Sequence, residues 1–279
     1  MEDRTAIPGL PQIRRARGYR LYDRAGGRYL DLFQEGGAAI LGHRGASALA
    51  AMKNVLSQGL AAGLPSAWEA RLTCAVARMF PAYRAVRLYS SRQRALEAAS
   101  RFLGTRVGPS DLLDPALDPS AAARSRAALW RPLLPTDVEI GGAADRPAAV
   151  LLPVLPFSVC GAPAPVCFLD ELPGSVPGSD IIPGFLLAGA LRALAGLGSA
   201  TGRKAFAGLP LDGTRGWKRV GPYVRAVFDR AEYPGVFAQF LRAGVLLSPE
   251  YPGPSILPGE CSPGEEKLLA GLFARFPGG

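Results

Sequence analysis

Few side chains in this sequence could carry acid–base, nucleophilic or metal chemistry, and they are dispersed. His43 is the only histidine, and the four cysteines form no CxxC pair. Because a zinc site needs several such ligands at short spacing, the pattern argues against a metal site. Amine chemistry has few candidates as well, since almost all positive charge is arginine. The lysines are Lys53, Lys204, Lys218 and Lys267.

One carboxylate stands where an α/β fold collects its ligands. Residues 166–169 form an apolar run that leads directly into Asp170. Such runs are typical of strands buried in a parallel sheet, and ligands gather at the carboxyl ends of these strands. Asp170 is therefore a candidate binding residue. The alternative is a strand-end aspartate that is hydrogen-bonded to a neighbouring loop.

A second candidate is a turn of small residues before a helix. Ser91 follows a predicted strand over residues 85–89 and is the expected N-cap of a helix that runs to about residue 103. A helix N-terminus favours anions, because its first N–H groups are free and its dipole is positive there. Arg92 and Arg94 in the first turn could attract an anion, yet they also crowd the space that it would occupy.

The surrounding pattern alternates strands with helices. Residues 18–33 predict a β-hairpin, because two strand-like segments flank a turn that contains glycines. Ser66 with Glu69, and Ser262 with Glu265, have the spacing of a capping box at a helix start. Helical patterns cover residues 46–60, 66–80, 91–103 and 262–276, with another inside 223–244, and strand-like runs cover residues 85–89, 148–154, 166–169 and 245–247.

This order predicts an α/β protein with a mainly parallel sheet, helices on both faces and a small α+β subdomain at the C-terminus. Residues 105–147 are poor in pattern, and only residues 120–130 look helical there. Residues 184–200 are apolar and rich in glycine. The expected parts are an N-terminal arm and hairpin over residues 1–45, a large domain over 46–215 and the small subdomain over 216–279.

Composition and charge narrow the class of protein. Hydrophobic residues make up 48% of the chain and charged residues 20%, which favours a folded core over disorder. No run approaches the roughly 18 apolar residues of a membrane span, and no targeting segment is evident, so we expect a cytoplasmic protein with no membrane partner. The net charge is +9, but its arginines are scattered, which argues against a nucleic-acid footprint.

Several segments, in order, resemble class III pyridoxal-phosphate aminotransferases, and most closely glutamate-1-semialdehyde aminomutases. GYRLYDRAGGRYLDLF is similar to the opening hairpin of that family, and ILGHRGASALAAM to its LGH turn and helix. RLYSSRQRALEAASRFLG stands where the family has RFxNSGTEAxxxAxRLAR. AAVLLPV and CFLDEL are similar to the family's strands AAVIxEPV and LIFDEV. The segment that begins at Tyr233 is similar to the family's closing subdomain. The resemblance implies a reduced pyridoxal-phosphate transferase fold of type I.

The resemblance also assigns site residues. It implies that Asp170 pairs with the pyridine nitrogen of pyridoxal phosphate and that Ser91 lies in the phosphate turn, where Arg92 replaces a glycine. The Schiff-base lysine position falls on Ala190, and alanine has no amine to form that bond. Lys204, which lies further along the chain, is the fallback amine. The family's stacking aromatic and the glutamate of its EPV motif are also missing.

Three hypotheses follow. The first is a non-catalytic relative, a pseudoenzyme without a bound cofactor, which pairs as a homodimer or as a heterodimer with an active paralogue, because the family assembles as dimers. The second is an active pyridoxal-phosphate transaminase or aminomutase with rearranged residues. The third is an arginine-rich binder of anions or nucleic acid.

Overall fold

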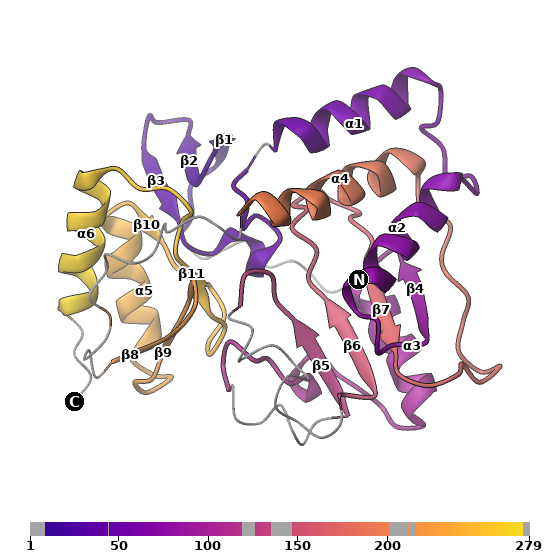
Figure 1. Cartoon of the computed structure of the whole chain (residues 1–279). Helices are drawn as coiled ribbons and strands as arrows, with labels where there is room; N and C mark the ends of the chain where they lie inside the picture. Colours follow the sequence, from indigo (N-terminus) through magenta and orange to yellow (C-terminus); the bar gives the residue numbers. More distant parts are fainter. Residues whose placement is uncertain are drawn as a thin grey trace. The chain divides into compact units, whose positions relative to one another are not determined.

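The structure is a computed structural model of the whole chain, and it divides into two compact units (Figure 1). We call Gly45–Thr201 the sheet unit, and Met1–Arg44 together with Gly202–Gly279 the terminal unit. The first and last segments of the chain thus belong to one unit, whereas the three sequence segments with boundaries after residues 45 and 215 stay a prediction. The residues described are 9–43, 45–118, 126–134, 147–200, 211 and 216–275.

The sheet unit is built on four strands in the order β4, β7, β6, β5. β5 and β6 are parallel, whereas β7 is antiparallel to both of its neighbours, so β4, β5 and β6 share one direction. This mixed α/β architecture confirms the predicted α/β class, but the sheet is not mainly parallel as expected, because among its neighbouring strands only β5 and β6 form a parallel pair. The strands are β4 (Ala85–Tyr89), β5 (Ala127–Trp130), β6 (Val150–Pro153) and β7 (Ala164–Phe168).

Two local predictions in this sheet are corrected by the structure. The run at residues 166–169 is a strand, but an antiparallel one, because the connection from β6 is shorter than the dozen or so residues that a parallel crossover needs. Residues 127–130, the end of the expected helical piece, form β5, and all four side chains are buried. Burial between neighbours overrides the helix propensity of alanine there. Residues 119–125 lie outside the described residues.

Helices cover both faces of this sheet, as predicted. On one face, α3 packs its alanines and leucines against Val150, Leu152 and Phe168. Alternate residues such as Leu151 and Cys167 point to the other face, where α2 packs on β4 and β7, and α4 lies between α2 and α1 (Figure 1). The helices are α1 (Ala46–Ser57), α2 (Ala67–Met79), α3 (Arg92–Leu103) and α4 (Gly184–Ala200).

The capping box predicted at Ser66 is not formed. The Ser66 hydroxyl makes no cap hydrogen bond, and it is buried without a partner among the described residues. The first turn of α2 is held instead by a backbone bond from Glu69 to the Ser66 carbonyl. Packing explains the difference, because the hydroxyl lies against Gly184 at the start of α4, where a methyl group would be 3.4 Å from it.

The terminal unit combines the two ends of the chain. The predicted hairpin is confirmed by antiparallel pairing of β2 (Arg20–Asp23) with β3 (Arg28–Asp31). β1 (Ile13–Arg17) pairs with β2, and β10 (Val245–Leu246) lies parallel to β3 on its other side. A short 3-10 helix, η1 (Gln34–Gly37), follows β3. β10, which comes from the C-terminal part of the chain, is therefore the last strand of this four-stranded sheet, opposite β1.

An aromatic core supports this sheet. The indole of Trp217 contacts the rings of Phe228, Phe240 and Phe273, with centroids 4.9–5.8 Å apart. Ser262 and Glu265 form the capping box that the sequence predicts, which starts the last helix. The remaining elements are η2 (Pro109–Asp111) in the sheet unit and β8 (Trp217–Val220), β9 (Tyr223–Ala226), β11 (Ser255–Ile256), α5 (Tyr233–Arg242) and α6 (Pro263–Ala274) in the terminal unit.

Candidate anion site at the start of helix α3

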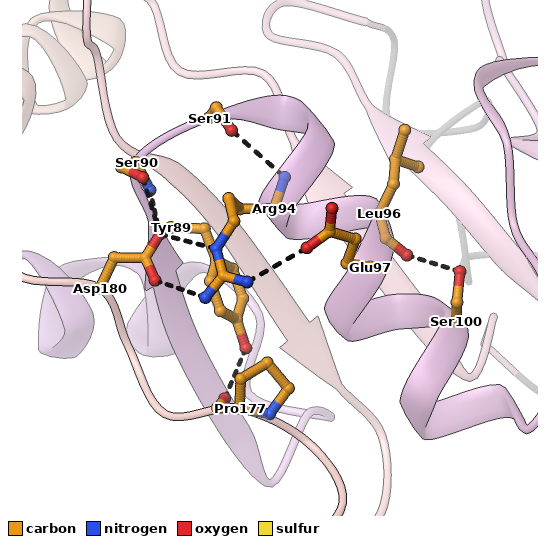
Figure 2. A network of polar contacts seen from close by, with 9 residues as sticks. All are labelled: Tyr89, Ser90, Ser91, Arg94, Leu96, Glu97, Ser100, Pro177 and Asp180. Carbon is orange, nitrogen blue, oxygen red and sulfur yellow. Dashed lines mark hydrogen bonds and ion pairs between the residues drawn. The ribbon is translucent and has the colours of Figure 1, made fainter. Parts of the chain in front are cut away.

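A network of polar contacts in the sheet unit lies at the start of α3 (Figure 2). β4 ends at the buried Tyr89, and the chain turns through Ser90 and Ser91 into the helix. The Ser91 hydroxyl accepts a hydrogen bond from the Arg94 amide at 3.2 Å, which confirms Ser91 as the N-cap. The turn therefore combines two features that favour an anion: a small residue and the positive end of a helix.

A carboxylate of the protein itself occupies this turn. Asp180 Oδ2 accepts from the amide of Ser90 at 3.0 Å and from its hydroxyl at 2.7 Å. Its Oδ1 accepts from Arg94 Nη2 at 2.9 Å. The hydrogen bond with Arg94 is the main reason that the pKa of Asp180 falls to about 2, so the side chain is ionised at neutral pH. The helix start thus holds an anion that belongs to the same chain.

The segment that carries Asp180 is fixed along β4. The Asp180 amide donates to the Leu88 carbonyl at 2.9 Å, and the Leu88 amide donates to Ser179 Oγ at 3.2 Å. The Tyr89 hydroxyl donates to the Pro177 carbonyl at 2.9 Å (Figure 2). These bonds run beside the free edge of the strand, and they place the Asp180 carboxylate at the turn.

Arg94 is committed within the protein. Beside Asp180, it contacts Glu97 Oε2 at 3.1 Å, one turn along α3. Arg94 thus lies between two carboxylates, and its charge is balanced without any ligand. In sequence reasoning this arginine could have attracted an anion, and the structure shows which one it binds.

The structure does not bring Asp170 and Ser91 together. Ala85, at the start of β4, pairs with Phe168, so Asp170 lies beyond the start of that strand, whereas Ser91 lies beyond its end. The two residues therefore lie at opposite ends of β4, because β7 is antiparallel to β4. Asp170 is exposed, and no hydrogen bond or ion pair involves it within the described residues.

The positions considered for the catalytic amine lie on different elements of the fold. Ala190 is fully buried in the middle of α4. Lys53 on α1, Lys218 on β8 and Lys267 on α6 are all exposed. Lys204 lies outside the described residues. No buried lysine amine is therefore available in the part of the chain that the structure describes.

Sequence reasoning missed Asp180, which is the residue that completes the cluster. It lies 86 positions from Arg94, in a loop rich in proline and glycine with no periodic pattern. Neither spacing nor motif connects the two residues, and only the fold does so. A weak signal was available: two arginines in the first turn of a helix, where acidic residues are normally favoured, call for an acidic partner elsewhere.

Among the described residues, no group of three or more His, Cys, Asp or Glu side chains could hold a metal ion. No helix in the described ranges is long and apolar enough to cross a membrane.

Comparisons with known proteins agree with this fold, although no family model matches the chain. An uncharacterized protein of Treponema pallidum (strain Nichols) is 30% identical over 297 residues, which cover 88% of this chain and 89% of that protein. The glutamate-1-semialdehyde 2,1-aminomutase of Desulfosudis oleivorans is 32% identical over 139 residues, 45% of this chain and 32% of that enzyme. An omega-transaminase from Sphaerobacter thermophilus has a similar structure, with a TM-score of 0.72 at 14% identity, over 97% of this chain and 91% of that one.

The fold is that of the pyridoxal-phosphate-dependent aminotransferases of fold type I. Within that class, the chain belongs to the family of the Treponema protein, and it is a shortened relative of class III aminotransferases. Its match to the aminomutase spans about a third of that enzyme's length. The resemblance stated from the sequence is confirmed.

Proposed function

We propose that the protein is a catalytically silent member of the class III aminotransferase superfamily, which keeps the scaffold and binds no pyridoxal phosphate at the start of α3. The observation that carries the proposal is Asp180, whose ionised carboxylate accepts hydrogen bonds from Ser90 and from the Arg94 guanidinium at this turn. The residues at this turn therefore do not fit the cofactor that the fold implies.

Electrostatics support this proposal. A phosphate ester carries about two negative charges at neutral pH. Placing it beside the Asp180 carboxylate costs about 1 to 4 kcal/mol for each pair of charges about 4 Å apart, depending on exposure. Of the two arginines in the first turn of α3, Arg94 is already paired with Asp180 and Glu97. Both the position and the charge of a phosphate group are thus opposed.

The amines of the chain also support the proposal. A Schiff-base lysine works when it is held beside the cofactor, and its amine is commonly activated by an apolar or cationic environment. The described lysines are exposed on α1, β8 and α6. The proposed loss of the lysine at Ala190 agrees with this distribution, and Lys204 is the remaining amine to be tested.

Binding of pyridoxamine phosphate tests the phosphate turn separately from the lysines, because this amine forms no Schiff base with protein. We expect equilibrium dialysis to show no saturable binding to the wild-type protein. Asp180→Asn removes the blocking charge, and any gain of affinity for the ligand should appear in this variant and not in Asp170→Asn. Saturable binding to the wild type that is lost in Ser91→Ala would overturn the proposal.

The proposal includes assembly. A silent chain with this fold would act by pairing with a second copy or with a catalytically active relative. Sedimentation of the purified chain, alone and mixed with such a relative, distinguishes the two arrangements, and a monomer in both experiments would contradict this part.

A further inference from the structure

The N-terminal strand β1 is an edge strand that carries unbalanced positive charge. It lies at the end of its sheet and pairs only with β2 among the described residues. Arg14, Arg15 and Arg17 lie on it, and Arg24 lies in the turn that follows β2. All four are exposed, and we call them the basic edge. Half of the N–H and C=O groups of an edge strand point away from its partner and remain available for pairing.

Two arginines of this edge, Arg15 and Arg17, share one direction. Arg15 pairs across the ladder with Tyr22, and Arg17 pairs with Arg20, so Arg15 and Arg17 point to the same side. Ala16 lies between them and packs towards the core. A register shift between Ile13 and Arg15 falls at Arg14. β1 therefore presents basic side chains at alternate positions beside a free backbone edge.

Nearby carboxylates do not balance this charge. Asp23 is buried and accepts from the Gly27 amide and the Tyr29 hydroxyl. Asp31 is buried as well and pairs with His43. Glu260 and Glu265 are bound to Arg20, the residue opposite Arg17. Within the described residues, none of the four basic-edge arginines has an ion pair.

Two like charges directly opposite on a ladder are unfavourable. Arg17 and Arg20 are such a pair, and only Arg20 is neutralised within the chain. A negatively charged partner on the Arg17 side would complete the arrangement. Charge complementarity and the free edge thus point to the same kind of ligand.

We propose that β1 accepts an extended acidic segment of a partner protein as an additional strand. Main-chain hydrogen bonds would supply the pairing, and carboxylates at alternate positions would lie opposite Arg15 and Arg17. This inference does not depend on the absence of catalysis. A single-stranded nucleic acid fits less well, because it needs aromatic faces on which bases stack, and the Arg15 guanidinium covers the Tyr22 ring at 4.3 Å from its centre.

The experiment uses the full chain and a fluorescein-labelled peptide of alternating glutamate and threonine, with binding followed by fluorescence anisotropy. We expect saturable binding that weakens as salt rises. The triple variant R14Q/R15Q/R17Q should bind about tenfold more weakly or worse, because the two cross-strand charge pairs at Arg15 and Arg17 and the nearby charge of Arg14 are lost. The matched control R78Q/R101Q/R275Q removes the same charge from exposed helical sites and should bind as the wild type does.

A second peptide separates strand addition from simple charge attraction. It has the same sequence, with alternate backbone amides methylated so that it cannot pair along an edge, and we expect it to lose binding. Should the triple variant not fold by circular dichroism, Arg17→Gln alone should weaken binding about two- to fivefold.

Four results would overturn the proposal. Equal loss in the control variant would show that total charge matters and not the edge. Equal binding of the methylated peptide would exclude strand addition, and tighter binding of an oligouridine with the same dependence on the basic edge would assign the surface to nucleic acid. Absence of peptide binding, with self-association of the triple variant, would show that the arginines only protect the edge.

Discussion

Two aspartates in loops of the sheet unit have opposite surroundings. Asp180 binds Ser90 and Arg94 at the start of α3, whereas Asp170 is exposed at the opposite end of β4. We expect Asp180→Asn to lower the free energy of unfolding by about 1 kcal/mol, because charge-assisted hydrogen bonds are lost at a partly exposed site. Asp170→Asn should change it by less than about 0.5 kcal/mol. Urea unfolding measures both.

The pH dependence of this difference has a defined sign. The pKa of Asp180 is lowered to about 2, chiefly by Arg94. Its contribution to stability is therefore present above the ordinary aspartate pKa of about 3.9 and is lost as pH falls towards 2. Equal stability of Asp180→Asn and wild type at neutral pH would mean that the carboxylate does not hold the turn.

His43 and Asp31 form another charged pair, in the terminal unit, in which the aspartate is buried. His43 Nε2 lies 2.7 Å from Asp31 Oδ2. Burial lowers the pKa of His43, but the hydrogen bond and charge of Asp31, with a contribution from Glu35, raise it further, so the net pKa is above the usual value. The pair therefore stabilises the protein below the ordinary histidine pKa of about 6.5, and this contribution is lost as pH rises through the folded-state pKa.

We expect His43→Ala to lower the free energy of unfolding by about 3 kcal/mol at mildly acidic pH, since a buried carboxylate loses its partner. The difference in the free energy of unfolding between His43→Ala and the wild type should become smaller towards higher pH. Denaturant unfolding at several pH values measures this difference. NMR titration of the His43 ring checks the cause: Asp31→Asn should lower the His43 pKa. A gap that widens with pH would contradict this account.

At the scale of elements, α4 packs closely on α1 and depends on a glycine. A methyl group at Gly189 would lie 2.7 Å from Met52 Cγ and from the Phe157 ring, whereas one at Gly198 would meet nothing within 4 Å. We expect Gly189→Ala to destabilise the protein by about 1–3 kcal/mol through overpacking. Gly198→Ala in the same helix should stabilise it by up to about 1 kcal/mol, from helix propensity alone. Thermal unfolding compares the two, and similar effects would show that the close approach is absent.

Elements whose signals are local could be predicted from the sequence. The hairpin, the Ser91 N-cap and the Ser262 capping box each depend on residues a few positions apart. The predictions that were wrong concern features that depend on residues far apart in the sequence. β5 is a strand because it is buried beside β6, and the Ser66 hydroxyl turns away from α2 because Gly184 lies against it.

The candidate site shows the same limit. Ser91 could be found because a serine before a helix has a fixed local geometry. Asp180 could not, because its place at the turn follows from hydrogen bonds between the loop and β4. Likewise, the distance between Asp170 and Ser91 depends on the direction of β7, which the apolar run at residues 166–169 does not encode.

At the scale of the whole molecule, the two ends of the chain form one unit because β10 pairs with β3. A contact between segments so far apart leaves no trace in local periodicity. The scaffold that results is shared with aminotransferases, whereas the residues at the start of α3 are arranged around the chain's own carboxylate. Fold and chemistry are therefore separate properties in this protein.

Covalent trapping decides whether this scaffold performs pyridoxal-phosphate chemistry. The purified protein is incubated with pyridoxal phosphate and reduced with borohydride, and its peptides are analysed by mass spectrometry. We expect only weak labelling shared among exposed lysines such as Lys53, Lys218 and Lys267. Stoichiometric labelling of one lysine, above all Lys204, would show that the proposed loss of catalysis is wrong.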